Sequence, residues 1–274
     1  ADSKYWLWIN DQLVIFEGGL KRGPSPSGTY YDPVDIAPYL TKGSNTIAIL
    51  LWHFGKDGFS HINSGKAALL FEAIAPGLEI VSDASWQCAL YEAYQNTEAP
   101  FPNYRMPESN IRFDARQAIT NWNRTSFEGS LPGAVCVGKA GKAPFGELVE
   151  RPIPQWKNSG LLSYVSVRES LRGDTLFCRL PYNAQITPYL KVEAEAGKTI
   201  HIRMDNYEGG SERNVRAEYI THEGEQEYES YGWMNGHEVY YIIPEGVKVL
   251  DVKYRETGYN TDLAGSFHCD DPFY

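Results

Sequence analysis

The sequence predicts an all-β protein, because short strand patterns recur from one end to the other while helical periodicity is nearly absent. Apolar and polar residues alternate over short segments, and Gly, Pro, Asn or Asp separates each segment from the next. A proline-rich stretch divides the strands into an earlier and a later group. Two β-sandwiches joined by an irregular connection account for this order, and 274 residues suit about two domains.

The earlier group of strands covers residues 1–95. Residues 4–10 (KYWLWIN) are aromatic and β-branched, and the apolar segment 47–52 (IAILLW) has the length of a buried strand. Segments 66–73 and 78–91 add further strand patterns before the rhythm stops. We therefore expect a first sandwich over 1–95.

The middle of the chain, residues 96–159, is expected to be an irregular connecting region. It is rich in Pro, Asn, Gly and Arg, and such a long stretch without regular structure is unusual inside a compact domain. At most a short helix, near 113–122, is expected there. The prolines of this region are Pro100, Pro102, Pro107, Pro132, Pro144, Pro152 and Pro154.

A second sandwich is expected over residues 160–274, where strand patterns resume. Alternation is clear in KTIHIRMDNY at 198–207, whose Ile200 and Ile202 share one face. Many short strands separated by turn residues are typical of a sandwich or jelly roll. The other strand segments are 163–170, 175–181, 188–197, 217–222, 237–244 and 247–256.

Charge and hydropathy argue against nucleic acid and membrane as partners. The formal net charge of -10 repels polyphosphate, so nucleic acid is not an expected partner. No apolar run reaches the about 18–20 residues that a membrane-spanning helix needs. The N-terminal residues ADSKYWLWIN carry no basic segment followed by an apolar one, so no signal peptide is expected in this chain.

Residues 35–52 (DIAPYLTKGSNTIAILLW) resemble the galactose-binding type of jelly roll, in which a turn ending in an apolar residue precedes Gly-x-Asn and an alternating strand. Each position has a local physical reason. Leu40 closes the end of the sandwich, Gly43 supplies a left-handed turn residue, and Asn45 can bond back to the turn backbone. Jelly rolls of this family usually have strands ahead of the one that begins at Lys4, so the first sandwich is expected to lack its N-terminal strands.

Later segments resemble bacterial α-L-rhamnosidases, which are glycoside hydrolases. GELVERPIPQW at 146–156 is similar to a linking segment of that family, and 224–267 is similar to its last sandwich strands. Residues 268–274 (HCDDPFY) are similar to the start of the helical barrel that carries the family's catalytic acids. The resemblance implies a non-catalytic β-sandwich fragment without its barrel, a ligand that is a rhamnose-containing plant or bacterial glycan, and a periplasmic or extracellular location.

The loop at 52–65 (WHFGKDGFSHINSG) is the candidate carbohydrate site, because it combines aromatic faces for sugar C–H groups with polar ends for hydroxyls. The alternative is that this loop packs on a neighbouring domain. No cofactor is expected, and no ligand spacing is tight enough for a metal site, although calcium on loop carboxylates and carbonyls is left open. The candidate carbohydrate-binding residues are Trp52, His53, Asp57, His61, Asn63 and Trp233.

No catalytic residue is predicted in this chain. A glycosidase needs two carboxylates about 5–5.5 Å or 6.5–9.5 Å apart across a sugar cleft. Glu223, Glu225, Glu227 and Glu229 alternate in sequence, so they share one face of a strand, and such a row is typical of a solvated sheet face. Asp270-Asp271 is interpreted as a helix cap.

Three functional hypotheses follow. The first is an accessory part of a rhamnosidase-type hydrolase that braces the barrel. The second is a free-standing carbohydrate-binding or adhesion protein, and the third is a complete hydrolase with an unrecognised site. A sandwich that has lost its barrel is expected to expose an apolar patch around Trp233 and 272–274, which would favour self-association.

Overall fold

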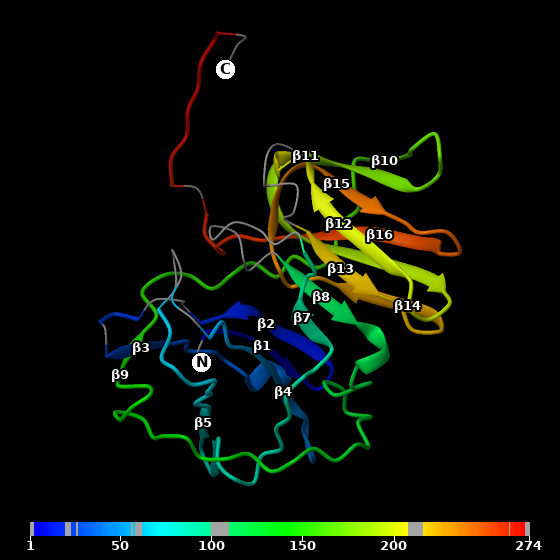
Figure 1. Ribbon diagram of the computed structural model, residues 1–274. Coiled ribbons are helices and arrows are strands. Elements are labelled where there is room, and N and C mark those ends of the chain that lie inside the picture. Colours follow the sequence, from blue (N-terminus) through cyan, green and yellow to red (C-terminus); the bar gives the residue numbers. More distant parts are fainter. Residues whose placement is uncertain are drawn as a thin grey trace.

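The computed structural model describes residues 3–19, 23–25, 27–55, 57, 62–99, 110–207, 216–262 and 264–271. Strands dominate these residues, which confirms the all-β class (Figure 1). The helical turns in this part of the chain are three-residue 3-10 turns, namely η1 (Ala37–Tyr39), η3 (Ala115–Gln117) and η4 (Asp205–Tyr207). None of the helices described is long and apolar enough to cross a membrane.

The first sheet has three antiparallel strands in the order β2 (Gln12–Gly18), β1 (Lys4–Ile9) and β4 (Ile47–Trp52). Side chains alternate across it, because successive residues of a strand point to opposite faces. Trp6, Trp8, Phe16 and Ala48 form one buried cluster, while Leu7, Ile9 and Ile15 form another. The sheet is therefore covered on both faces.

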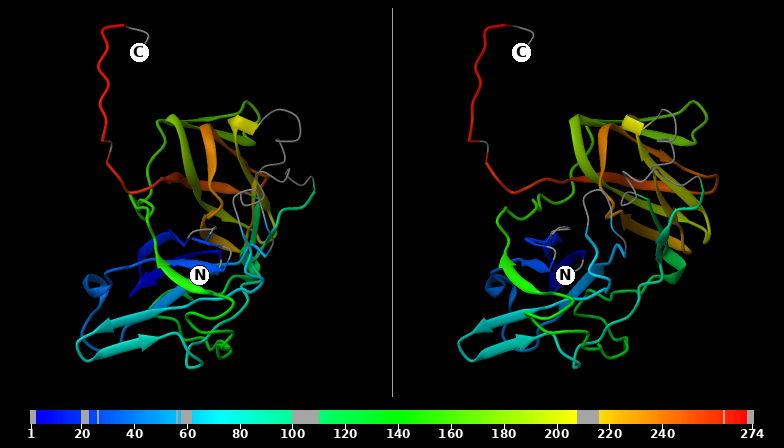
Figure 2. Two further views of the ribbon diagram at one scale, coloured as in Figure 1. Left: turned by 90° about the vertical axis from the view of Figure 1, so that its left-hand side faces the viewer. Right: turned by 60° about the vertical axis from the view of Figure 1, so that its left-hand side comes forward.

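Two small sheets accompany the first one. The hairpin β5 (Glu72–Ala75) and β6 (Leu78–Val81) projects away from the rest of the molecule (Figure 2). The strands β3 (Gly28–Tyr31) and β9 (Glu147–Glu150) pair in parallel, which ties the early chain to a segment more than a hundred residues later. This pairing brings the LVERPIP segment beside the first sheet.

The second sheet has nine strands and contains the main core. Its central strand is β11 (Thr175–Ala194), which is 20 residues long. The first part of β11 pairs with β10 (Ser166–Glu169) and β15 (Met234–Ile242). The second part pairs with β14 (Gly224–Glu229) and β16 (Lys248–Glu256).

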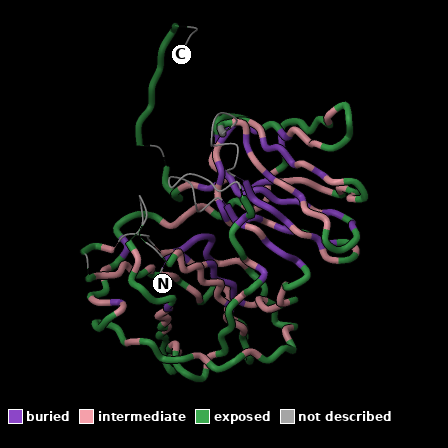
Figure 3. Tube along the Cα trace, in the orientation of Figure 1, coloured by how far each residue is buried: buried purple, intermediate pink, exposed green. Residues whose placement is uncertain are grey.

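The register of β11 against β15 breaks between Arg179 and Ala184. Pro181 lies in this break, and a proline cannot donate a backbone hydrogen bond to the ladder. The long strand β11 can therefore bend here, so that its first part belongs to one layer of the sheet and its second part to the other. The core between the layers is buried, as the purple tube of Figure 3 shows. Its fully buried members include Cys178, Ile186, Val192, Ile200, Ile202, Ala217, Val239 and Tyr241.

The far edge of this sheet corrects one expectation from the sequence. Beyond β15 the order continues through β12 (Thr199–Met204), β13 (Ala217–Ile220), β8 (Ile111–Asp114) and β7 (Tyr94–Asn96). The connecting region 96–159 is therefore not wholly irregular. Over 113–122, where at most a short helix was expected, the chain forms the end of β8 and then the short 3-10 helix η3.

Long-range pairing explains this difference. Strand β8 lies in parallel beside β13, whose residues come about a hundred positions later in the chain. Ile111 and Phe113 are buried, and Phe113 belongs to the main core, but such a distant partner is invisible in the local sequence. The division into 1–95, 96–159 and 160–274 stays a prediction, but β7 and β8 add to the sheet that the last unit forms.

Aromatic packing joins the first sheet to the second. The ring of Tyr231, which precedes β15, stacks on Trp6 with 4.7 Å between ring centroids. The guanidinium of Arg255 lies 5.1 Å from the centroid of Phe16. Asn158 bridges the same junction, because it donates to the Leu13 carbonyl at 3.1 Å and accepts from Arg255 at 2.7 Å. We call this the intersheet junction.

Candidate functional site

Trp52 ends β4 and lies at the intersheet junction. Its ring is parallel to that of Trp6 within 17°, with 6.4 Å between centroids. The ammonium of Lys4 lies 4.2 Å from the Trp52 centroid, within the range of a cation–π contact. Trp52 is half-buried. Part of its ring surface is therefore used in packing, and only the remainder can meet a sugar.

His53 follows Trp52 and is half-buried as well. Its Nδ1 is excluded from solvent and has no hydrogen-bond partner among the residues that the structure describes. A buried polar atom without a partner costs free energy that a ligand hydroxyl could recover. This nitrogen is therefore the strongest polar feature of the candidate loop.

The side chains of Asp57 and Asn63 accept hydrogen bonds from backbone N–H groups of the loop and so stabilise its conformation. The Asp57 carboxylate accepts from the backbone N–H of Asn63 at 2.8 Å. The Asn63 side chain accepts from the Gly65 N–H at 2.9 Å. His61 lies outside the described residues. The structure thus places Trp52 and His53 together and Asp57 with Asn63 beyond them.

Trp233 lies two residues after Tyr231, just before β15, and is half-buried. Tyr231 and Trp52 both stack on Trp6. Trp233 is therefore two residues in sequence from the intersheet junction at which Trp52 lies, although Trp233 and Trp52 are far apart in the chain. Among the residues that the structure describes, no group of three or more His, Cys, Asp or Glu side chains is arranged to hold a metal ion.

The glutamates of β14 lie along the outer surface of the sheet, where each contacts a side chain of a neighbouring strand. Glu225 lies 2.6 Å from the ammonium of Lys191, and Glu227 accepts from the Tyr189 hydroxyl at 2.7 Å. Burial raises the pKa of Tyr189, and the hydrogen bond to the Glu227 carboxylate raises it further. The shared face that the sequence predicted is thus observed, and Glu225 and Glu227 are paired with side chains of the neighbouring strand.

Glu229 is bound more firmly than the other glutamates of the row. Its two oxygens accept from Arg255 at 2.7 and 3.0 Å, and one of them also accepts from Thr187 at 2.9 Å. A bidentate pair of this kind fixes both partners. Glu229 therefore supports the intersheet junction through Arg255.

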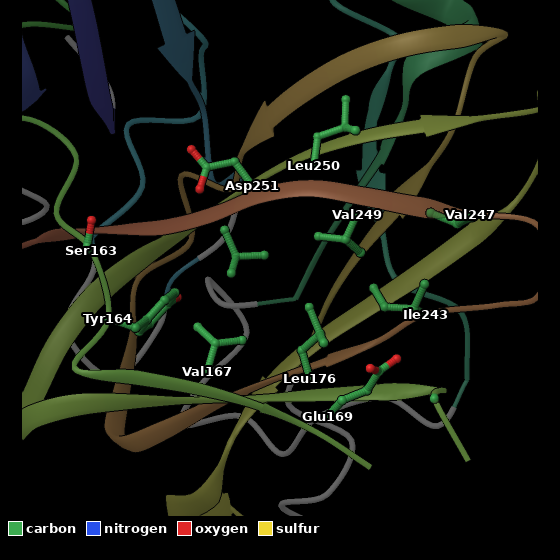
Figure 4. A pocket seen from close by; sticks show the side chains of 12 residues that line it. Ser163, Tyr164, Val167, Glu169, Leu176, Ile243, Val247, Val249, Leu250 and Asp251 are labelled. Atoms are coloured by element: carbon green, nitrogen blue, oxygen red, sulfur yellow. The ribbon is translucent and has the colours of Figure 1, made fainter. Parts of the chain in front are cut away.

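A cavity of about 540 Å³ opens between β10 and β16 (Figure 4). Glu169 and Asp251 stand on opposite strands around it, and the rest of the lining is mainly apolar. The Tyr164 hydroxyl donates to the Lys253 carbonyl at 3.1 Å and lies 2.8 Å from the Tyr241 hydroxyl. Sequence reasoning missed this cavity, because its walls come from segments about eighty positions apart. The apolar lining residues are Val167, Leu176, Ile243, Val247, Val249, Leu250 and Val252.

Comparison with known proteins identifies the fold. No protein-family profile matches the sequence, and no curated protein matches it either. Solved structures do match. The GH78 family rhamnosidase of Bacillus sp. GL1 superimposes with a TM-score of 0.80 at 15% identity, over 99% of this chain and 52% of that one.

Two further solved structures give the same result. The α-L-rhamnosidase of Aspergillus terreus matches with a TM-score of 0.66 at 18% identity, over 98% of this chain and 33% of that one. The Streptomyces avermitilis α-L-rhamnosidase, solved with L-rhamnose, matches with a TM-score of 0.62 at 18% identity, over 94% of this chain and 26% of that one. The chain thus spans only part of each of these proteins. The expected likeness to α-L-rhamnosidases is confirmed at the level of the fold.

Proposed function

We propose that this chain is a non-catalytic β-sandwich part of an α-L-rhamnosidase-type glycoside hydrolase. The observation that supports this most is the 99% coverage of this chain by a rhamnosidase structure of which it spans 52%. The substrate of the whole protein would be a rhamnose-containing plant or bacterial glycan, met in the periplasm or outside the cell. The part of the protein beyond this chain would be a helical barrel that supplies the catalytic acids.

The distribution of carboxylates supports a non-catalytic role. Glycoside hydrolysis needs a protonated acid and a second carboxylate held across a cleft. The β14 glutamates bind Lys191, Tyr189 and Arg255 instead. Glu169 and Asp251 lie around one cavity, whose other lining residues are mainly Val, Leu and Ile. A brace for the catalytic part fits these features better than a hydrolytic site.

We expect the isolated chain to hydrolyse an aryl α-L-rhamnoside no faster than buffer does. Release of the aryl group, with an intact α-L-rhamnosidase as the positive control, measures this. The hydrolase hypothesis would take the lead if turnover were found and were then lost in Glu169→Gln, Asp251→Asn or Glu227→Gln. Turnover that survives all three changes would point to a contaminating enzyme.

Carbohydrate binding at the loop 52–65 is the second part of the proposal. The unpartnered His53 Nδ1 and the half-buried Trp52 ring give the loop a polar and an apolar element. Self-association stays a prediction, because residues 272–274 lie outside the described residues and Trp233 is half-buried. Calcium binding by loop oxygens also stays a prediction.

We expect L-rhamnose to shift the NMR signals of Trp52 and His53 with millimolar affinity at best, since a partly covered ring and a few hydrogen bonds leave little surplus over the entropy of binding. His53→Ala should abolish these shifts, whereas Asn63→Ala, which removes only a loop contact, should reduce them little. D-glucose serves as the control sugar. A titration that stays flat to high rhamnose concentration would exclude binding at the loop.

A further inference from the structure

The nine-stranded sheet carries a row of arginines and aromatic rings across its outer face. Strand register places Arg168 beside Phe177, Phe177 beside Tyr240, and Tyr240 beside Arg203. The Arg168 guanidinium carbon lies 4.2 Å from the Phe177 centroid, and that of Arg203 lies 5.9 Å from the Tyr240 centroid. The two rings meet edge to face at 5.2 Å. The row runs over β10, β11, β15 and β12.

Arg203 differs from the other arginines near it, because its guanidinium forms no hydrogen bond or ion pair with any residue that the structure describes. Its Nε is excluded from solvent and has no partner. Arg203 is half-buried, so solvent screens its charge incompletely. A partly buried guanidinium without a counter-charge is costly, and a bound anion would remove that cost.

Other positive groups surround Arg203. The register that pairs Ile202 with Ala217 brings Arg216, the residue just before β13, next to Arg203, and like charges side by side on a sheet repel. Burial lowers the pKa of His201, and Arg216, Arg112 and Arg203 act in the same direction against Glu218. The electrostatic potential at this point of the sheet therefore favours an anion, although the chain as a whole is acidic.

The carboxylates of this face are engaged with other groups. Glu218 lies between Arg216 at 2.7 Å and Arg112 at 2.8 Å. Glu238 accepts from Arg168 at 3.3 Å.

Glu98 and Asp205 are bound as well. Glu98 lies 2.8 Å from Arg112. Asp205 accepts from the backbone N–H groups of His237 and Glu238 at 2.8 and 3.2 Å. None of these contacts reaches Arg203, so the described residues supply no counter-ion for it.

We propose that Arg203 is the centre of a binding site for the carboxylate of an acidic sugar. Contact with Tyr240 holds the guanidinium at the sheet surface, and its edge keeps N–H donors for a planar carboxylate, which a guanidinium binds in bidentate geometry. A net charge of -10 disfavours a multiply charged phosphate relative to a singly charged carboxylate. The assignment of the carboxylate to a sugar rests on the proposed function, whereas the anion site itself does not.

The test is a titration of the whole chain with D-galacturonate, D-glucuronate, L-rhamnose and inorganic phosphate, followed by NMR. We expect a uronate to shift signals on β12 and β15. Arg203→Gln should weaken this binding by about tenfold or more, because a charge-assisted pair is lost. Arg203→Lys should weaken it less. Arg172→Gln serves as the matched control, because it removes an exposed guanidinium from the turn between β10 and β11.

The effect of Arg203→Gln on uronate binding distinguishes the possible results. Uronate binding that Arg203→Gln abolishes and Arg172→Gln preserves, with thermal unfolding unchanged, supports the proposal. No uronate binding, or equal binding by Arg203→Gln, overturns it. Phosphate binding without uronate binding overturns the assignment to an acidic sugar. Rhamnose binding at the loop and rhamnoside hydrolysis are measured separately, so failure here is distinct from failure of the proposed function.

Discussion

Replacing Arg151 with alanine is expected to lower the free energy of unfolding by about 3–5 kcal/mol, the usual cost of breaking a buried ion pair from one side. The Arg151 and Asp32 side chains are only 1% and 4% exposed, and they lie 3.2 Å apart. Arg151 also donates to the carbonyls of Gly19 and Ile153 at 3.2 and 3.1 Å. Its loss would leave the Asp32 carboxylate buried without a counter-charge.

The surroundings of Asp32 explain why this loss should be large. Asp32 also accepts from the Tyr5 hydroxyl at 2.8 Å and from the Gly19 N–H at 2.7 Å. Burial raises the pKa of Tyr5, and the Asp32 carboxylate raises it further, so Tyr5 remains a neutral donor. These bonds orient the carboxylate but cannot neutralise it. The Arg151 guanidinium is therefore the group that makes its burial tolerable.

Urea unfolding followed by tryptophan fluorescence measures this effect. Arg172→Ala, at an exposed turn, is the control and should change stability little. In the double variant Arg151→Ala with Asp32→Ala, the loss should be smaller than the sum of the two single losses, because the residues interact. An Arg151→Ala protein that unfolds at the wild-type urea concentration would show that this ion pair does not hold β9 to the first sheet.

Trp6→Ala is expected to cost about 3–5 kcal/mol, as truncation of a large buried aromatic residue generally does. Trp6 is 1% exposed and contacts three rings. Tyr231, Phe16 and Trp52 lie with their centroids 4.7, 6.3 and 6.4 Å away, respectively. Tyr231 belongs to the segment before β15, so the change would weaken the junction between the two sheets as well as the first sheet itself.

Calorimetry and limited proteolysis measure both consequences. We expect Trp6→Ala to lower the unfolding temperature and to expose the first sheet to protease before the second. Trp86→Ala, which removes a half-buried ring near the hairpin β5–β6, is the matched control and should cost less. If Trp6→Ala left the melting profile unchanged, the aromatic cluster would not be what joins the two sheets.

The local patterns of the sequence predicted the strands that depend on alternation. The segment that begins KYWLWI became β1, and its tryptophans and Leu7 and Ile9 lie on opposite faces as period-two alternation requires. Asn45 bonds back to its own turn, since its side chain donates to the carbonyls of Thr41 and Gly43 at 2.9 and 3.0 Å. Such features need only neighbours in the chain, so the sequence contains their cause.

The candidate carbohydrate site was predictable only in part. Composition pointed to the loop after β4, but it could not show that Lys4 and Trp6 occupy part of the Trp52 ring. It also could not reveal the unpartnered nitrogen of His53 or the cavity between β10 and β16. These properties depend on residues from separate strands, whose side chains come together only when the sheets pack.

The sequence by itself determined the all-β class, the alternation of the main strands and the shared face of the β14 glutamates, because each follows from the two-residue period of an extended chain. Tertiary structure alone decided that β8 lies beside β13, that Arg151 is buried against Asp32, and that the Arg203 Nε has no hydrogen-bond partner among the described residues. The physical reason is that hydrogen-bonded ladders and buried charges are satisfied by partners about a hundred residues away. A local sequence pattern does not identify which distant residue will form the contact.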